Sequence, residues 1–162
     1  MINTTLCYIE KDDKYLMLHR VKKENDLNRD KWIGVGGKFL ENETPDECVV
    51  RETMEETGLI LTKYRLRGVI TFLSNEYEGE YMYLYTATEF TLENGRKYEN
   101  ENELPDCDEG VLEWVSKNEV CNLPIWEGDK LFFKELIEDN GFFTMKLRYE
   151  GKKLVESNIM YH

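Results

Sequence analysis

Residues 37–59 read GKFLENETPDECVVRETMEETGL, and this stretch specifies a helix with both ends marked. Thr44 is a good N-cap, the proline after it fits the first helical position, and Glu47 completes a capping box with Thr44. Gly58 is a typical C-terminal stop, because glycine readily adopts the left-handed conformation that ends many helices. The sequence therefore predicts a helix over 44–57.

Three carboxylates of this helix, Glu52, Glu55 and Glu56, fall within an arc of about 100° on a helical wheel. Like charges three and four residues apart destabilise a bare helix by a few tenths of a kcal/mol per pair, and Arg51 alone cannot neutralise all three. Mg²⁺ prefers hard oxygen ligands and is commonly shared between carboxylates and substrate phosphates. The pattern predicts that this face of the helix binds a divalent cation.

The spacing of the fixed residues in this stretch resembles the signature of the Nudix hydrolases. One departure is Thr53, which stands where the family pattern prefers an aliphatic residue. The resemblance implies a single α/β domain over 1–162, built as an α/β/α sandwich around a mixed β-sheet. It also implies hydrolysis of a nucleoside diphosphate linked to another group. The matching positions are Gly37, Glu43, Arg51, Glu52, Glu55, Glu56, Gly58 and Leu59.

The same resemblance implies a role for each matching position. Arg51 is expected to orient a glutamate, with Glu43 in support, and the cofactor is Mg²⁺, with Mn²⁺ as the alternative. Glu109 matches a loop glutamate of similar proteins, so either Glu109 or Glu52 would act as the general base. The implied metal ligands are the Gly37 carbonyl and the carboxylates of Glu52, Glu55, Glu56 and Glu109.

Three further stretches, WIGVGGK over 32–38, DEGVLEWV over 108–115 and PIWEGD over 124–129, are similar to the MutT-type oxidised purine nucleoside triphosphatases of this family. The likeness implies that Trp126 packs against the base and that Asp129 hydrogen-bonds it. Ile33 and Gly128 stand where the animal enzymes place polar residues, so the exact base stays open. Basic residues expected to help bind the phosphates are Arg20, Lys23 and Lys38.

The composition limits the class of partner. The chain has 33 acidic and 21 basic side chains, a net charge of −12, which argues against binding a nucleic-acid polymer and against action on RNA 5′ ends. No apolar run reaches the ~20 residues that span a bilayer, so a cytoplasmic protein without a membrane segment is expected. The four cysteines contain no CxxC pair, and the oligomeric state, monomer or homodimer, stays open.

The rest of the chain predicts short strands, a long polar loop and a second helix. Asp129 is expected to cap the second helix, whose apolar stripe would comprise Leu131, Phe132, Leu136 and Ile137. The expected elements are strands at 6–9, 15–18, 64–72, 81–90, 111–115, 144–149 and 154–160, an exposed loop over 93–110, and a helix over 129–139.

The sequence as a whole predicts a Mg²⁺-dependent hydrolase that converts a purine nucleoside triphosphate, such as 8-oxo-dGTP, to the monophosphate and pyrophosphate. The physiological role would be sanitation of the nucleotide pool. One alternative is a dinucleoside tetraphosphate hydrolase, for which Tyr77 lies in the expected region. Another is a nucleotide-sensing protein that keeps the fold without catalysis, although its signature residues are intact.

Overall fold

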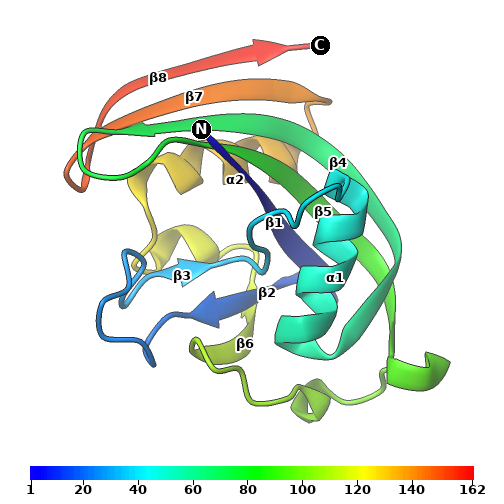
Figure 1. Cartoon of the computed structure of the whole chain (residues 1–162). Coiled ribbons are helices and arrows are strands. Elements are labelled where there is room, and N and C mark those ends of the chain that lie inside the picture. Colours follow the sequence, from blue (N-terminus) through cyan, green and yellow to red (C-terminus); the bar gives the residue numbers. More distant parts are fainter.

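The computed structural model describes all 162 residues and contains a mixed eight-stranded β-sheet flanked by two helices (Figure 1). The strand order is β3-β2-β1-β5-β4-β7-β8, with β6 paired to β2. β1 runs parallel to β5 and β4 parallel to β7, whereas the other pairs are antiparallel. The strands are β1 (Ile2–Lys11), β2 (Lys14–His19), β3 (Trp32–Ile33), β4 (Leu59–Ser74), β5 (Glu80–Leu92), β6 (Val111–Ser116), β7 (Phe143–Glu150) and β8 (Lys153–Tyr161); the helices are α1 (Pro45–Thr57) and α2 (Glu127–Glu138).

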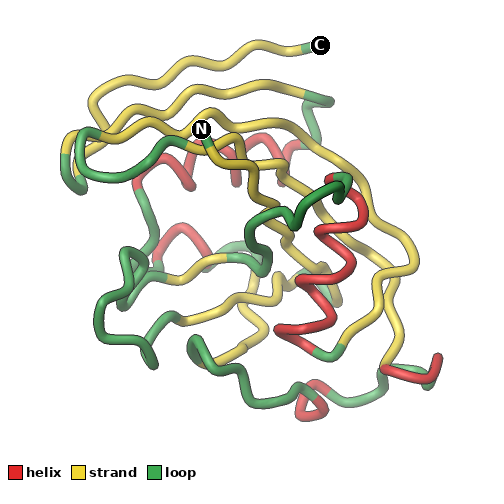
Figure 2. Tube along the Cα trace, viewed as in Figure 1, coloured by secondary structure: helices red, strands yellow, loops and turns green.

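The two helices cover opposite faces of the sheet, as the alternation of side chains along β1 shows. Cys7 and Ile9 pack in the same core as Val49 of α1. Tyr8, which lies between them, packs in a second core with Phe132 of α2. Because successive side chains of a strand point to opposite faces, the sheet separates the two cores. The expected α/β/α sandwich around a mixed sheet is therefore confirmed (Figure 2).

The predicted first helix is confirmed at both ends. The Thr44 side chain accepts a hydrogen bond from the Glu47 N–H at 3.1 Å, and the Glu47 carboxylate accepts one from the Thr44 N–H at 2.8 Å. Gly58 ends the helix with a φ of 73°, in the left-handed region. The caps hold the carboxylate-bearing helix in a fixed register next to the loop that precedes it.

The second helix differs from its prediction. Its N-cap is Trp126, so Asp129 lies inside the first turn and does not cap the helix. Leu131 and Ile137 are exposed, whereas Phe133 is fully buried. The physical reason is the actual arc of the buried face: at 100° per residue, residues 129, 132, 133 and 136 fall within about 100°, and residues 131 and 137 lie outside it. Asp129 lies within this arc, so its carboxyl group is buried as well.

The long acidic loop over 93–110 contributes to the core, contrary to the expectation of a fully exposed segment. Tyr98 is buried, and its ring lies 5.4 Å from the ring of Phe90. Its hydroxyl accepts a hydrogen bond from the Trp114 Nε1–H at 2.9 Å. One aromatic side chain thus fixes this polar loop to the sheet, and the loop leads into β6, which pairs with β2.

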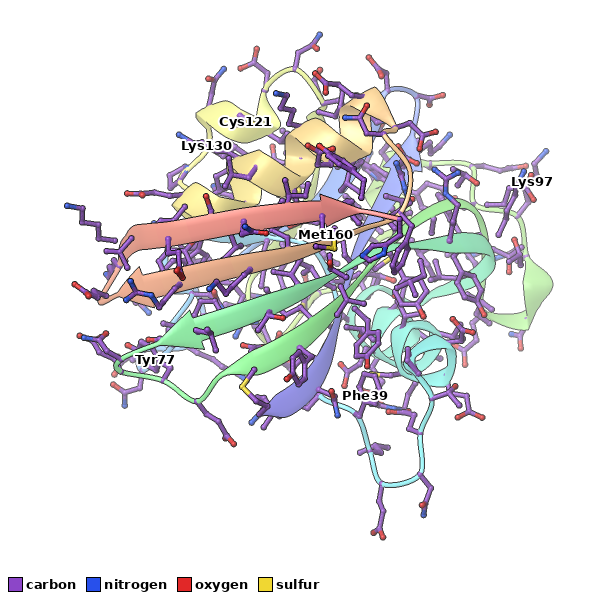
Figure 3. The ribbon with its side chains drawn as sticks, turned by 90° about the horizontal axis from the view of Figure 1, so that it is seen from above. Phe39, Tyr77, Lys97, Cys121, Lys130 and Met160 are labelled. Atoms are coloured by element: carbon purple, nitrogen blue, oxygen red, sulfur yellow. The ribbon has the colours of Figure 1, made fainter.

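Viewed from above, β8 forms one edge of the sheet and exposes Met160 (Figure 3). The turn between β4 and β5 carries Tyr77, which is also exposed. No helix in the structure has the length and apolar character needed to cross a membrane.

Candidate active site

A cavity of about 470 Å³ is lined by residues of the sheet, of both helices and of the glycine-rich loop over 34–37. It contains most of the predicted site residues. Its volume is within the range of small-molecule sites. Three of the predicted residues, Lys23, Arg51 and Glu55, do not line it. Those that do are Arg20, Gly37, Lys38, Glu52, Glu56, Glu109, Trp126 and Asp129.

Backbone pairing fixes the glycine-rich loop to β1. The Thr5 N–H donates to the Gly37 carbonyl at 2.9 Å, and Cys7 exchanges two backbone hydrogen bonds with Val35. Gly36 has a φ of 151°, and a Cβ there would collide with the Thr5 carbonyl. Only glycine allows the loop to lie this close to the strand, and so to reach the cavity.

Arg51 connects the loop to the carboxylates of α1. Its guanidinium donates to both carboxylate oxygens of Glu43, to Glu52 Oε1 at 2.8 Å and to Glu55 Oε2 at 3.2 Å. The pKa of Glu43 falls to about 2, mainly because of the hydrogen bonds from Arg51. The Glu55 side chain is 58% exposed and lies on the Arg51 side of the helix, outside the cavity.

Glu56 lies at the cavity wall, where its surroundings disfavour the ionised form of its carboxyl group. The Gly36 N–H donates to its carboxylate at 3.2 Å. Burial raises the pKa of Glu56 to about 8, and the nearby charge of Glu109 adds to the effect. A buried carboxylate with excess negative charge nearby is stabilised by a cation.

Glu109 is held by two basic residues. Arg20 donates to one of its oxygens at 3.0 Å, and Lys23 lies 3.4 Å from the other. Arg20 also donates to Asp26 at 2.7 Å, which fixes the guanidinium in place. Arg20 lines the cavity together with Glu109, whereas Lys23 does not.

The oxygen donors at this end of the cavity fit Mg²⁺ or Mn²⁺. No three acidic, histidine or cysteine side chains lie close enough together to form a ready-made metal site. Even so, Glu52, Glu56 and Glu109 line the same cavity, and all offer the hard oxygen ligands that these cations prefer. The Gly37 carbonyl, the other proposed ligand, accepts hydrogen bonds from the Thr5 N–H at 2.9 Å and, more weakly, from the Cys48 thiol at 3.6 Å. The raised pKa of Glu56 supports the same assignment, because a bound cation would stabilise its ionised form.

The opposite end of the cavity is built around Trp126. Its Nε1–H donates to the Asn28 side chain at 2.8 Å, the ring edge packs on Tyr149 at a centroid distance of 5.3 Å, and Lys31 lies 5.4 Å from the ring centroid. Burial raises the pKa of Asp129 to about 8, and its carboxyl makes no hydrogen bond with another side chain. This end offers a flat apolar surface and a carboxyl group without a side-chain hydrogen-bond partner, a combination suited to a heteroaromatic ring.

Two positions, Ile33 and Gly128, depart from the residues that the similar animal enzymes carry, and the structure explains only Gly128. Ile33 lines the cavity and adds only apolar surface. At Gly128 a Cβ would lie 2.6 Å from Leu147 and 2.7 Å from the Tyr149 hydroxyl, so no side chain fits. The Gly128 N–H donates to that hydroxyl at 2.8 Å. Tyr149 thus occupies the space that a side chain at position 128 would need.

Sequence reasoning missed several cavity residues. Asn28 belongs to a polar stretch without periodicity, and Glu80 closes the polar turn after β4, so neither carried a recognisable signal. Thr4 lines the cavity from β1 and hydrogen-bonds Glu80. Tyr77, in contrast, lies in an exposed turn and does not line the cavity (Figure 3).

Comparison with known proteins places this site in a family. The NUDIX domain model matches residues 2–136. The chain is 31% identical over 149 residues to the uncharacterised Nudix hydrolase YvcI of Bacillus subtilis, covering 90% of this chain and 85% of that protein. It is 28% identical over 133 residues to an oxidised purine nucleoside triphosphate hydrolase of Danio rerio, covering 82% and 79%. A MutT protein from Bacillus halodurans superposes with a TM-score of 0.80 at 26% identity, covering 98% and 97% of the two chains.

Proposed function

The chain belongs to the Nudix family, whose members hydrolyse phosphoanhydride bonds, and on this premise we propose that it is a Mg²⁺-dependent pyrophosphohydrolase of purine nucleoside triphosphates. The leading substrate is 8-oxo-dGTP, and the products are the monophosphate and pyrophosphate. The observation that supports this most is a single cavity with carboxylates at one end and Trp126 with Asp129 at the other. Relatives named as oxidised purine nucleoside triphosphate hydrolases point the same way.

The carboxylate end is assigned to the cation. Glu52, Glu56 and Glu109 are its proposed ligands together with the Gly37 carbonyl, while Glu55 must turn from Arg51 to join them. When bound, Mg²⁺ or Mn²⁺ would neutralise phosphate charge and lower the pKa of a bound water. Arg51 acts as a positioning residue, because it holds Glu52 through a hydrogen bond at 2.8 Å.

The proposed hydrolysis also needs basic residues that bind the phosphates and one carboxylate that accepts a proton. Arg20 and Lys38 line the cavity and are assigned to the phosphates, and Lys23 acts through Glu109. Water attacks phosphorus, the bridging P–O bond breaks, and pyrophosphate leaves. The proton of the water passes to Glu52 or Glu109, the two candidates for general base. Each is held by a guanidinium, so comparing pH–rate profiles of the two glutamine variants distinguishes them.

The test is a set of glutamine variants assayed for pyrophosphate release with Mg²⁺ and with a chelator. Glu52→Gln and Glu56→Gln should lower kcat at least a hundredfold, because each removes a cation ligand from the cavity. Glu41→Gln is the matched control, since Glu41 is exposed in the loop that precedes α1 and makes no side-chain hydrogen bond or ion pair. Activity of the first two variants at the parent level would refute the assigned metal end.

A substrate panel tests the nucleotide. Comparing kcat/KM for 8-oxo-dGTP, dGTP, a dinucleoside tetraphosphate and ADP-ribose should rank the oxidised purine triphosphate first. Preference for the dinucleoside tetraphosphate would favour the alternative hydrolase. Nucleotide binding without pyrophosphate release would favour a sensing protein. We further assign residues 1–162 to one catalytic domain that takes a small nucleotide as its partner.

A further inference from the structure

Glu80 places a carboxyl group on the floor of the cavity, and the family signature does not include it. Glu80 and Met82 of β5 both line the cavity, whereas Tyr81 between them is 41% exposed on the other face. Across the sheet, Glu80 pairs in register with Phe72 of β4, which is also a cavity residue. The first residue of β5 therefore brings an ionisable group beside Phe72, whose ring lies 5.4 Å from that of Tyr149, and Tyr149 in turn packs against Trp126.

A single hydrogen bond fixes the Glu80 side chain. The Thr4 hydroxyl donates to Oε2 at 2.8 Å, while Oε1 makes no hydrogen bond within the chain. Burial raises the pKa of Glu80, and the Thr4 hydrogen bond and the charge of Lys38 partly offset that increase. One oxygen is thus anchored by the protein, and the other is left as an acceptor for a ligand.

The surroundings make this acceptor selective. The apolar residues that line the same cavity include Leu6, Phe72, Met82, Trp126 and Leu147. In such an environment a carboxylate that lacks a donor is costly, and a hydrogen bond to it from a ligand N–H is correspondingly strong. Ile33 offers no hydrogen-bonding group, and position 128 has no room for one. The polar recognition lost at these two positions must come from elsewhere in the cavity.

We propose that Glu80, anchored by Thr4, is a specificity-determining residue that accepts a hydrogen bond from the exocyclic 2-amino group of a guanine-type base. This inference rests on the proposed function, because it assigns the aromatic end of the cavity to the base. Asp129 supplies a second carboxyl group at the same end. A base without the 2-amino group leaves the Glu80 oxygen unpaired, so it binds more weakly.

Binding of dGMP and dIMP, measured by calorimetry without metal, provides the test, because the two nucleotides differ only in the 2-amino group. The parent protein should bind dGMP about tenfold to a hundredfold more tightly than dIMP. In Glu80→Gln the ratio should fall to about one, because the amide can still accept from Thr4 but presents a donor to the base. Glu78→Gln is the matched control, since Glu78 lies two residues away with a 66% exposed side chain. It should keep the parent ratio.

Every other outcome has a defined meaning. An unchanged dGMP-to-dIMP ratio in Glu80→Gln overturns the inference, and so does an equal loss of affinity for both nucleotides, which would indicate a structural role. Absence of binding of both monophosphates to the parent also overturns it. If Glu80→Gln fails to fold, Thr4→Val replaces it and should reduce the ratio at least threefold; an unchanged ratio contradicts the assignment. A Glu80-dependent preference for dGMP in a protein that releases no pyrophosphate would overturn the proposed function while leaving this inference standing.

Discussion

Arg51 and Glu43 are joined by two parallel hydrogen bonds, from Nε to Oε1 at 2.6 Å and from Nη2 to Oε2 at 3.0 Å. The same guanidinium donates from Nη1 to Glu52, which lines the cavity. Glu43 precedes α1 and Glu52 lies within it, so one planar side chain aligns the loop before α1 with the cavity wall. A bidentate pair of this kind fixes the relative orientation of the two side chains as well as the distance between them.

Replacing Arg51 with lysine tests this alignment. Lysine keeps the positive charge but cannot bind Glu43 and Glu52 together through a rigid fork. We expect Arg51→Lys to lower kcat at least tenfold and to lower Tm by several degrees, measured by pyrophosphate release and thermal unfolding. Arg65→Lys is the matched control, because Arg65 is 59% exposed and makes one hydrogen bond, to Asp139. Parent-like kcat in Arg51→Lys would argue against a positioning role.

The lowered pKa of Glu43 predicts a pH-dependent contribution to stability. The pKa is about 2 in the folded chain and 4.5 as a reference, so the ionised carboxylate favours folding. That contribution is fully present above about pH 4.5 and is lost as the pH falls towards 2. The Tm of the parent should therefore exceed that of Glu43→Gln at pH 6, and the two should converge near pH 2. A constant difference between pH 6 and pH 2 would contradict the assignment.

The raised pKa of Asp129 predicts the opposite dependence of folding stability on pH. Burial raises its pKa from 3.8 to about 8, so ionisation opposes folding. The cost is absent below about pH 4, grows as the pH rises, and is complete above about pH 8. Asp129→Asn should be more stable than the parent by roughly 1 to 3 kcal/mol at pH 8, and nearly equal at pH 4. Chemical denaturation at the two pH values measures this, and greater stability of the parent at pH 8 would contradict it.

Gly37 lies too close to Glu52 to tolerate a side chain. A Cβ at position 37 would be 2.6 Å from the carboxyl carbon of Glu52. Gly37→Ala should therefore displace this carboxylate and lower kcat about tenfold or more, with a change in Tm of only a few degrees. In a Glu52→Ala background the same substitution should have no further effect on kcat. Additive losses in the double variant would show that Gly37 acts independently of Glu52.

The first helix could be predicted because its two ends depend on local patterns in the sequence. Thr44, Glu47 and Gly58 act within a few residues of one another, so the caps could be predicted and were confirmed. The fold followed from the resemblance of the same stretch to the family signature. Whether Glu52 and Glu56 bind a cation stays a prediction, although both line the cavity.

The remaining parts of the site depend on tertiary contacts. Phe133 is buried because α2 packs on Tyr8 and Tyr15, and no local pattern reports that orientation. Glu80 could not be distinguished from the polar turn before it, since its place on the cavity floor arises from pairing with Phe72. Asn28 likewise gains its role only through contact with Trp126.

The backbone pairing of the glycine-rich loop with β1 has a consequence for how the protein can vary. The strand that receives this loop also supplies residues to both cores, so its position is set by the packing of the entire molecule. Substitutions distant from the cavity can therefore shift β1, and with it the glycine-rich loop, without changing a residue that lines the cavity. The other end of the cavity depends on the same strand, since Thr4 of β1 anchors Glu80 and Leu6 of β1 lines the cavity.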